Sequence, residues 1–180
     1  MEIKRDVYLD RLIVRKHNGL IKVITGIRRS GKSYLLNTLF YRHLIAENIS
    51  EDHIIKFAFD SAEDLLKIGE DPIVLDNEKE DRKVDPSKFI NWLMPQIKGD
   101  GMYYLLLDEV QKLGAFESVL NGFLRRENLD VYVTGSNSKF LSKDVLTEFR
   151  GRGDEVHVLP LSFSEYYTFK QGDKSEAYED

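Results

Sequence analysis

A short glycine-bearing segment, Gly26–Ser33, restricts the fold of this 180-residue chain more than any other feature. It reads Gly-Ile-Arg-Arg-Ser-Gly-Lys-Ser and fits the pattern G-x-x-x-x-G-K-[ST]. The β-branched run Ile21–Thr25 before it predicts a strand, and the apolar spacing of Lys32–Glu47 after it predicts a helix. In this order, successive backbone N–H groups can converge on an anion at the start of the helix. We therefore expect Gly26–Ser33 to bind phosphate groups.

Two side chains of this loop have separate expected roles. Lys32 is expected to reach the β- and γ-phosphates of a nucleotide, and the hydroxyl of Ser33 is expected to bind Mg²⁺. A structural glycine-rich turn is the alternative, and the flanking strand and helix argue against it. The residues expected to contact the nucleotide are Gly26, Ile27, Arg28, Arg29, Ser30, Gly31, Lys32, Ser33 and Tyr34.

Composition excludes several classes of protein. The chain has no Cys, which rules out disulfides and thiolate metal sites, and its longest apolar run, Met102–Leu107, is too short to cross a membrane. The first residues lack the apolar core of a secretory signal, so we expect a cytoplasmic protein without a membrane segment. A net charge of −5 argues against general nucleic-acid binding. Residues 1–50 are nevertheless basic, with ten Lys/Arg against four Asp/Glu.

Strand and helix patterns alternate along the rest of the chain, which predicts an α/β fold with a parallel sheet. The fully apolar run Met102–Leu107 is typical of a strand buried on both faces, and we expect it to be the central strand. The other predicted strands are His53–Phe59, Val131–Thr134 and Val156–Leu159, and the predicted helices are Ala62–Ile68, Phe89–Ile97, Phe116–Arg126 and Lys139–Phe149, with an exposed loop between the first two helices.

Two adjacent carboxylates, Asp108 and Glu109, follow the apolar run, at the end of a strand where open α/β sheets bind their ligands. Asp108 is expected to hold Mg²⁺ through its water shell, and Glu109 to orient a water molecule for attack on the γ-phosphate. A turn or helix cap is the alternative reading of such a pair. Together with the phosphate-binding loop, the pair indicates hydrolysis of a nucleotide.

Two further segments carry candidate residues. Asn137 follows the strand that ends at Thr134, and its amide could contact the γ-phosphate or the attacking water; a cap of the next helix is the alternative. Arg150 and Arg152 alternate with glycines before the last strand. One of them could stabilise transition-state charge in a neighbouring subunit, or both could be solvated surface residues.

At these four elements the chain resembles the AAA-type ATP-binding domain at the N-terminus of a large family of uncharacterised prokaryotic ATPases. The resemblance implies a three-layer P-loop NTPase fold with sheet order 5-1-4-3-2, Walker A at Gly26–Ser33 and Walker B at Asp108–Glu109. It also implies a sensor at Asn137 and an arginine finger at Arg152 rather than Arg150. The stretches that carry it are residues 24–33, 107–111, 134–138 and 151–152, with Leu159-Pro160-Leu161-Ser162-Phe163-Ser164-Glu165.

The chain departs from this family in two places. The acid-rich residues 69–84 look like an insertion, and the family normally continues into a second domain where this chain has a polar tail. We therefore expect an ATP-binding domain at residues 1–169, a tail at residues 170–180, and a C-terminal domain missing after it.

The resulting hypothesis is a Mg²⁺-dependent ATPase that acts as a switch or motor on a protein or nucleic-acid partner, and as a homo-oligomer if Arg152 acts in trans. A small-molecule kinase is one alternative, and Glu109 argues against it because an activated water would waste ATP. A non-hydrolysing, nucleotide-dependent interaction module is another. No Asn-Lys-x-Asp motif for guanine occurs, so ATP is the expected nucleotide.

Overall fold

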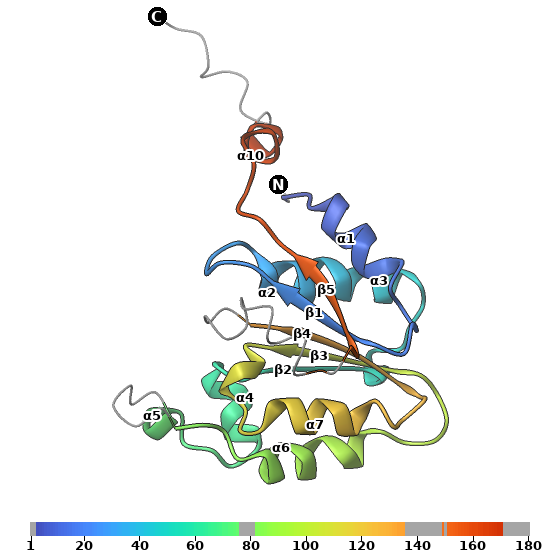
Figure 1. Cartoon of the computed structure of the whole chain (residues 1–180), viewed down its shortest axis with the longest axis vertical. Coiled ribbons are helices and arrows are strands. Elements are labelled where there is room, and N and C mark those ends of the chain that lie inside the picture. The colour runs from blue at the N-terminus through green and yellow to red at the C-terminus, as the bar shows by residue number, and fades with distance from the viewer. Residues whose placement is uncertain (1–2, 76–81, 136–148, 150, 171–180) are drawn as a thin grey trace, which may run out of the picture.

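The computed structural model describes residues 3–75, 82–135, 149 and 151–170 (Figure 1). A parallel five-stranded sheet in the order β2-β3-β4-β1-β5 forms its centre. This order is the predicted 5-1-4-3-2 order read from the other edge, so the predicted fold class is confirmed. The strands are β1 (Ile21–Thr25), β2 (Ile54–Ala58), β3 (Tyr103–Asp108), β4 (Leu129–Thr134) and β5 (Gly153–His157).

Helices cover both faces of the sheet and make a three-layer arrangement (Figure 1). One face packs against α1 (Asp6–Ile13) and the continuous helical segment α2 (Lys32–Tyr34), η1 (Leu35–Phe40) and α3 (Tyr41–Ala46). The other face packs against α4 (Ala62–Lys67), α6 (Pro86–Leu93) and α7 (Phe116–Phe123). The shorter elements are η2 (Glu51–His53), α5 (Pro72–Leu75), η3 (Met94–Gln96) and η4 (Val110–Lys112), and α10 (Phe163–Lys170) stands away from the sheet.

Strand β3 shows how the sequence pattern produces the two-sided core. Its six residues are all buried. Tyr103, Leu105 and Leu107 join the core under α6 and α7, while Tyr104 and Leu106 join the core under η1. Burial on both faces is therefore confirmed.

The prediction that this run is the central strand is wrong, because β4 occupies the middle of the sheet and β3 lies between β2 and β4. Every interior strand of a covered sheet has two buried faces, so an apolar run cannot distinguish the middle strand from its neighbours. The apolar pattern does not identify β4 as the middle strand, because every second residue of β4 is polar or carries a hydroxyl. These residues, Asp130, Tyr132 and Thr134, are nevertheless buried.

Several helix boundaries also differ from the prediction. The helices α1 and α10 were not predicted, and the loop expected after α4 contains the short helix α5. The predicted helix Lys139–Phe149 lies almost wholly outside the described residues, as does the tail after residue 170. No helix in the described part of the chain is long and apolar enough to cross a bilayer.

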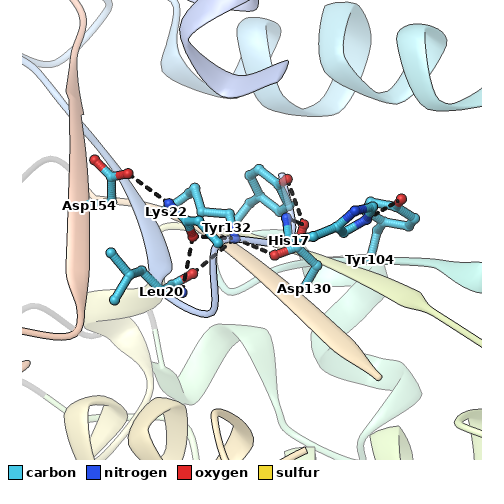
Figure 2. A network of polar contacts seen from close by, with 8 residues as sticks. His17, Leu20, Lys22, Tyr104, Asp130, Tyr132 and Asp154 are labelled. Atoms are coloured by element: carbon cyan, nitrogen blue, oxygen red, sulfur yellow. Dashed lines mark hydrogen bonds and ion pairs between the residues drawn. The ribbon is translucent and has the colours of Figure 1, made fainter. Parts of the chain in front are cut away.

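A buried polar network lies at the N-terminal edge of the sheet, opposite the phosphate-binding loop (Figure 2). The Lys22 ammonium donates to Asp130, whose second carboxylate oxygen accepts from the Tyr132 hydroxyl at 2.8 Å and the His17 N–H at 3.1 Å. The Tyr104 hydroxyl lies 2.7 Å from His17 Nε2. Burial lowers the pKa of Lys22 and raises that of Tyr104 to about 12. The network joins β1, β3 and β4 through compensated charges.

Candidate functional site

The two glycines of the predicted phosphate-binding loop occupy backbone positions that other residues would strain. Gly26 directly follows β1 with φ +145°, and a Cβ built on it would lie 2.3 Å from the carbonyl oxygen of Val158. Gly31 has φ +89° in the left-handed region and precedes the first residue of α2. The glycine spacing in the sequence therefore reflects a tight turn between a strand and a helix, as predicted.

Lys32 is folded into this turn and is only 4% exposed. Its ammonium donates to the carbonyl oxygens of Gly26 and Ile27, both at 3.0 Å. Burial lowers the pKa of Lys32, and the nearby charges of Glu109 and Asp108 oppose that shift. The cation is thus held inside the loop, where an anionic ligand would meet it.

Asp108 ends β3 and is only 6% exposed. One carboxylate oxygen accepts from the Ser33 hydroxyl at 3.0 Å and from the Thr134 hydroxyl, and the other accepts from the Asn37 amide at 3.2 Å. Burial raises the pKa of Asp108, and the hydrogen bonds from Thr134 and Ser33 oppose that shift. The structure therefore brings together the two residues that the sequence predicts for Mg²⁺.

Glu109 lies beside Asp108 in a left-handed conformation, with φ 53° and ψ 46°. Its backbone N–H donates to the Thr134 hydroxyl at 3.1 Å, and its carboxylate accepts from the Gln111 amide. The same hydroxyl donates to Asp108, so Thr134 links both acidic residues. A non-glycine residue in this backbone region is uncommon, and such strain is often retained at functional sites.

The remaining loop residues divide by exposure. Ile27, Arg28 and Arg29 are exposed, Ser30 is buried and Tyr34 is half-buried.

The other predicted residues lie elsewhere. Asn137 and Arg150 lie outside the described residues. Arg152 is exposed next to the start of β5, where its carbonyl accepts from the Ile21 N–H at 2.8 Å. The phosphate-binding loop follows the opposite end of β1, about 16 Å away at 3.3 Å per residue. The structure therefore does not bring Arg152 to the loop of its own chain.

Four residues at the site were not predicted from the sequence: Arg5, Asn37, Gln111 and Thr134. A signal was present for Asn37, which stands four residues after Ser33 and so shares its helix face. Thr134 was noted only as the end of a strand. The contact of Arg5 with the loop joins positions 25 residues apart and has no local sequence signal.

A parallel sheet in this order, with a glycine loop between the β1 strand and a helix, defines the P-loop NTPase class of fold. The sequence matches the AAA domain family over residues 18–167, and the chain belongs to that family. The predicted family resemblance is confirmed at this level. The second domain and the prokaryotic origin stay predictions.

Two uncharacterised proteins are similar in sequence over nearly the whole chain. One, from Haemophilus influenzae, is 35% identical over 173 residues, which cover 95% of this chain and 39% of that protein. The other, from Methanocaldococcus jannaschii, is 31% identical over 183 residues, covering 98% of this chain and 33% of that protein. The chain therefore spans between a third and two fifths of the length of these relatives.

Solved structures support the fold. A Walker-type ATPase of Pyrococcus abyssi superposes with a TM-score of 0.62 at 17% identity, over 95% of this chain and 57% of that one. The Aeropyrum pernix ORC1 protein, solved with DNA, gives 0.57 at 12% identity, over 100% of this chain and 51% of that one. AMPPCP-bound DnaA from Aquifex aeolicus superposes with a TM-score of 0.54 at 18% identity, over 95% of this chain and 51% of that one. At these identities the likeness is one of fold.

Proposed function

We propose that this domain binds ATP with Mg²⁺ and hydrolyses it to ADP and phosphate. The observation that carries the proposal is the contact between Ser33 and Asp108 at the mouth of the loop that encloses Lys32. It joins the end of β3 to the start of α2, the two elements that the proposed metal site requires. The AMPPCP bound to the similarly folded DnaA supports a nucleotide ligand.

The residues at this site suit Mg²⁺. Ser33 Oγ and Asp108 Oδ1 lie 3.0 Å apart, so one ion beside the loop could be held by Ser33 directly and by Asp108 through a water molecule. Both are oxygen donors, and Mg²⁺ typically takes few protein ligands besides water and phosphate. Bound Mg²⁺ would neutralise charge on the β- and γ-phosphates during transfer. Ser33 and Asp108 would hold it, and Lys32 would leave the Gly26 carbonyl to contact the phosphates.

Glu109 is the proposed general base. Its carboxylate orients a water and accepts its proton as the water attacks the γ-phosphate. Thr134 and Gln111 fix the backbone and the carboxylate of Glu109, respectively. We further propose Asn137 as the residue that contacts the γ-phosphate and Arg152 as a finger supplied to a neighbouring copy.

The energy of ATP hydrolysis would drive a conformational change in a larger assembly. We propose a nucleotide-dependent switch or motor that acts on a protein or nucleic-acid partner. The cytoplasmic location and the domain limits at residues 1–169 and 170–180 stay predictions.

The test is Mg²⁺-dependent phosphate release from ATP by the purified chain, with the Glu109→Gln variant as the blank. We expect release from the wild type, loss of release in Glu109→Gln with ATP binding retained, and loss of binding in Lys32→Ala. ATP binding without release above the blank would favour a non-hydrolysing module. Phosphate transfer to an added acceptor in place of water would favour a kinase.

A further inference from the structure

Arg5 is a buried arginine that contacts the outside of the phosphate-binding loop. It lies just before α1, is only 3% exposed, and donates to the Ser30 carbonyl at 2.9 Å and the Leu159 carbonyl at 2.7 Å. Its Nε lies 3.0 Å from a carboxylate oxygen of Glu165 in α10. A buried cation requires such partners: the guanidinium donates two hydrogen bonds to backbone carbonyls and forms an ion pair with the Glu165 carboxylate. Arg5 therefore ties three distant segments together.

The bond to Ser30 fixes a peptide group of the loop. The Ser30 carbonyl and the Gly31 N–H belong to one planar trans peptide and point in opposite directions. Because Arg5 holds the carbonyl, the Gly31 N–H points away from the guanidinium. Gly31 precedes α2, and N–H groups at the start of a helix are the ones that bind anions. Arg5 thus orients a donor of the proposed phosphate site.

The chain that leaves β5 contacts the other end of the same loop. The Val158 N–H donates to the Thr25 carbonyl at 2.8 Å, and the Val158 carbonyl lies against Gly26 so closely that a Cβ there would sit 2.3 Å away. The next residue, Leu159, accepts from Arg5. One end of the loop therefore contacts the segment that leads into α10 directly, and the other end is joined to it through Arg5.

Glu165 has a second task at the start of α10. Its other carboxylate oxygen accepts from the Ser162 N–H at 2.8 Å and the Ser162 hydroxyl at 2.9 Å, and its own N–H donates back to that hydroxyl at 3.2 Å. Ser162 and Glu165 thus form a capping box. The same carboxylate caps the N-terminus of α10 and pairs with Arg5, so formation of this helix and the position of the Arg5 side chain are linked.

We propose that Arg5 is a positioning residue of the phosphate-binding loop, and that the Arg5–Glu165 pair couples the docking of α10 to nucleotide affinity. The inference rests on the proposed function, because the affinity it concerns is that of the phosphate site. When α10 is docked, Glu165 and Leu159 hold the guanidinium against Ser30. When α10 leaves, the guanidinium loses the Glu165 carboxylate, and its hold on the Ser30–Gly31 peptide weakens.

Electrostatics alone predict the opposite effect. Glu165 is an anion near a site for anions, so loss of its charge should strengthen nucleotide binding if charge were its only influence. A positioning role predicts weaker binding. The sign of the change in the Glu165→Gln variant therefore separates the two explanations, and glutamine also keeps the capping box.

The experiment measures the dissociation constant of a non-hydrolysable ATP analogue with Mg²⁺ for four variants. Arg5→Lys keeps the positive charge but loses the planar guanidinium that contacts several acceptors at once, and should weaken binding about tenfold or more. Glu165→Gln should weaken it about three- to tenfold, within the usual range of coupling between sites. The double variant should bind no more weakly than Arg5→Lys alone, because the two residues act through one contact. Arg11→Gln changes an exposed arginine of α1, is the matched control, and should bind like the wild type.

A second readout needs no nucleotide. In the free protein, hydrogen exchange of the amides in residues 26–31 should be faster in Arg5→Lys and Glu165→Gln than in the wild type and Arg11→Gln. Tighter binding by Glu165→Gln, additive effects in the double variant, or unchanged exchange would each overturn the inference. If exchange responds as expected while the wild type binds no analogue, the proposed function fails and the role of Arg5 in holding the loop stands.

Discussion

At the scale of single residues, the hydroxyl of Thr134 contacts both acidic residues of the proposed site. It donates to the Asp108 carboxylate and accepts from the Glu109 N–H. The parallel pairing of β3 with β4 matches Leu107 with Val133, which brings Thr134 beside Asp108. One buried side chain on β4 thus orients two acidic residues with different proposed roles.

We predict that Thr134→Val lowers kcat for ATP hydrolysis about 10- to 100-fold, the usual cost of losing a partner that orients a ligand or base. KM for ATP should change little, because Thr134 acts on the acidic residues and the loop holds the phosphates. Steady-state phosphate release measures both constants. Thr134→Ser keeps the hydroxyl and should retain most of the activity; a loss confined to KM in Thr134→Val would contradict the assigned role.

Asp108 gives a prediction about stability and pH. Burial raises its pKa in the folded protein above the ordinary value. Its contribution to stability is therefore fully present below the ordinary aspartate pKa of about 3.9 and is lost as pH rises through the raised pKa. At neutral pH without Mg²⁺, Asp108→Asn should raise Tm by roughly 2–4 °C, the shift that about 1 kcal/mol produces in a chain of this size.

The gain should shrink as pH falls towards 4, because the wild-type carboxyl is then protonated. Thermal unfolding in EDTA at several pH values measures it. The exposed Asp100→Asn serves as the control and should leave Tm unchanged at every pH. A destabilised Asp108→Asn at neutral pH would show that the hydrogen bonds from Ser33 and Thr134 outweigh the cost of burying the charge.

At the scale of elements, local patterns predicted β1, β3 and β4 well because all of their residues are buried and most are apolar or β-branched. The edge strand β5 runs over Gly153–His157 rather than the predicted Val156–Leu159, and only Val156 of its residues is buried. The helix after the loop was predicted as one continuous piece, and the structure contains the π-helical turn η1 between α2 and α3. A π turn changes the backbone bonding without changing the apolar spacing, so the sequence carries no clear sign of it. Asn37, which contacts Asp108, lies in this turn.

The elements that were missed depend on contacts between distant residues. Helix α1 is held by Leu12 in the core and by Arg5, whose partners lie 25 to 160 positions away. The start of α10 does carry a local signal, the Ser162-x-x-Glu165 capping box, which sequence reasoning could have used. The middle position of β4 has no local signal, and only the family resemblance implied it through the order 5-1-4-3-2.

The turn from β1 into α2 supports a prediction at this scale. Gly26→Ala places a Cβ against the backbone oxygen of Val158, so it should destabilise the fold by about 2 kcal/mol or more and weaken nucleotide binding. Gly122→Ala in α7 is the matched control. It adds a Cβ where no atom lies within 4 Å and should stabilise by about 0.5–1 kcal/mol. Urea unfolding measures both, and an equally stable Gly26→Ala would refute the close packing at this turn.

At the scale of the whole molecule, the parallel sheet separates two kinds of polar residue. The carboxyl ends of β1, β3 and β4 gather Lys32, Asp108, Glu109 and Thr134, and the opposite edge holds the Lys22–Asp130 pair. Arg152 lies at this opposite edge, beside Ile21. The parallel topology thus places the backbone of Arg152 at the strand ends opposite the site of its own chain.

This arrangement predicts that hydrolysis needs two copies of the chain. If Arg152 completes the site of a neighbour, the contact is head-to-tail, with different surfaces on the two partners. Lys32→Ala and Arg152→Ala should each be inactive alone, since one lacks the phosphate contact and the other the finger. Mixed in equal amounts, they should recover about one quarter of the wild-type rate, because about one interface in four then joins an intact loop to an intact arginine.

Phosphate release from the mixture, compared with each variant alone across a range of protein concentrations, measures this recovery. Wild-type specific activity should rise with concentration for the same reason. Complementation by Arg150→Ala in place of Arg152→Ala would move the finger to that residue. Full activity of Arg152→Ala and Arg150→Ala at every concentration would mean that each copy hydrolyses ATP with groups of its own chain, and that the opposite edge of the sheet contributes only to stability.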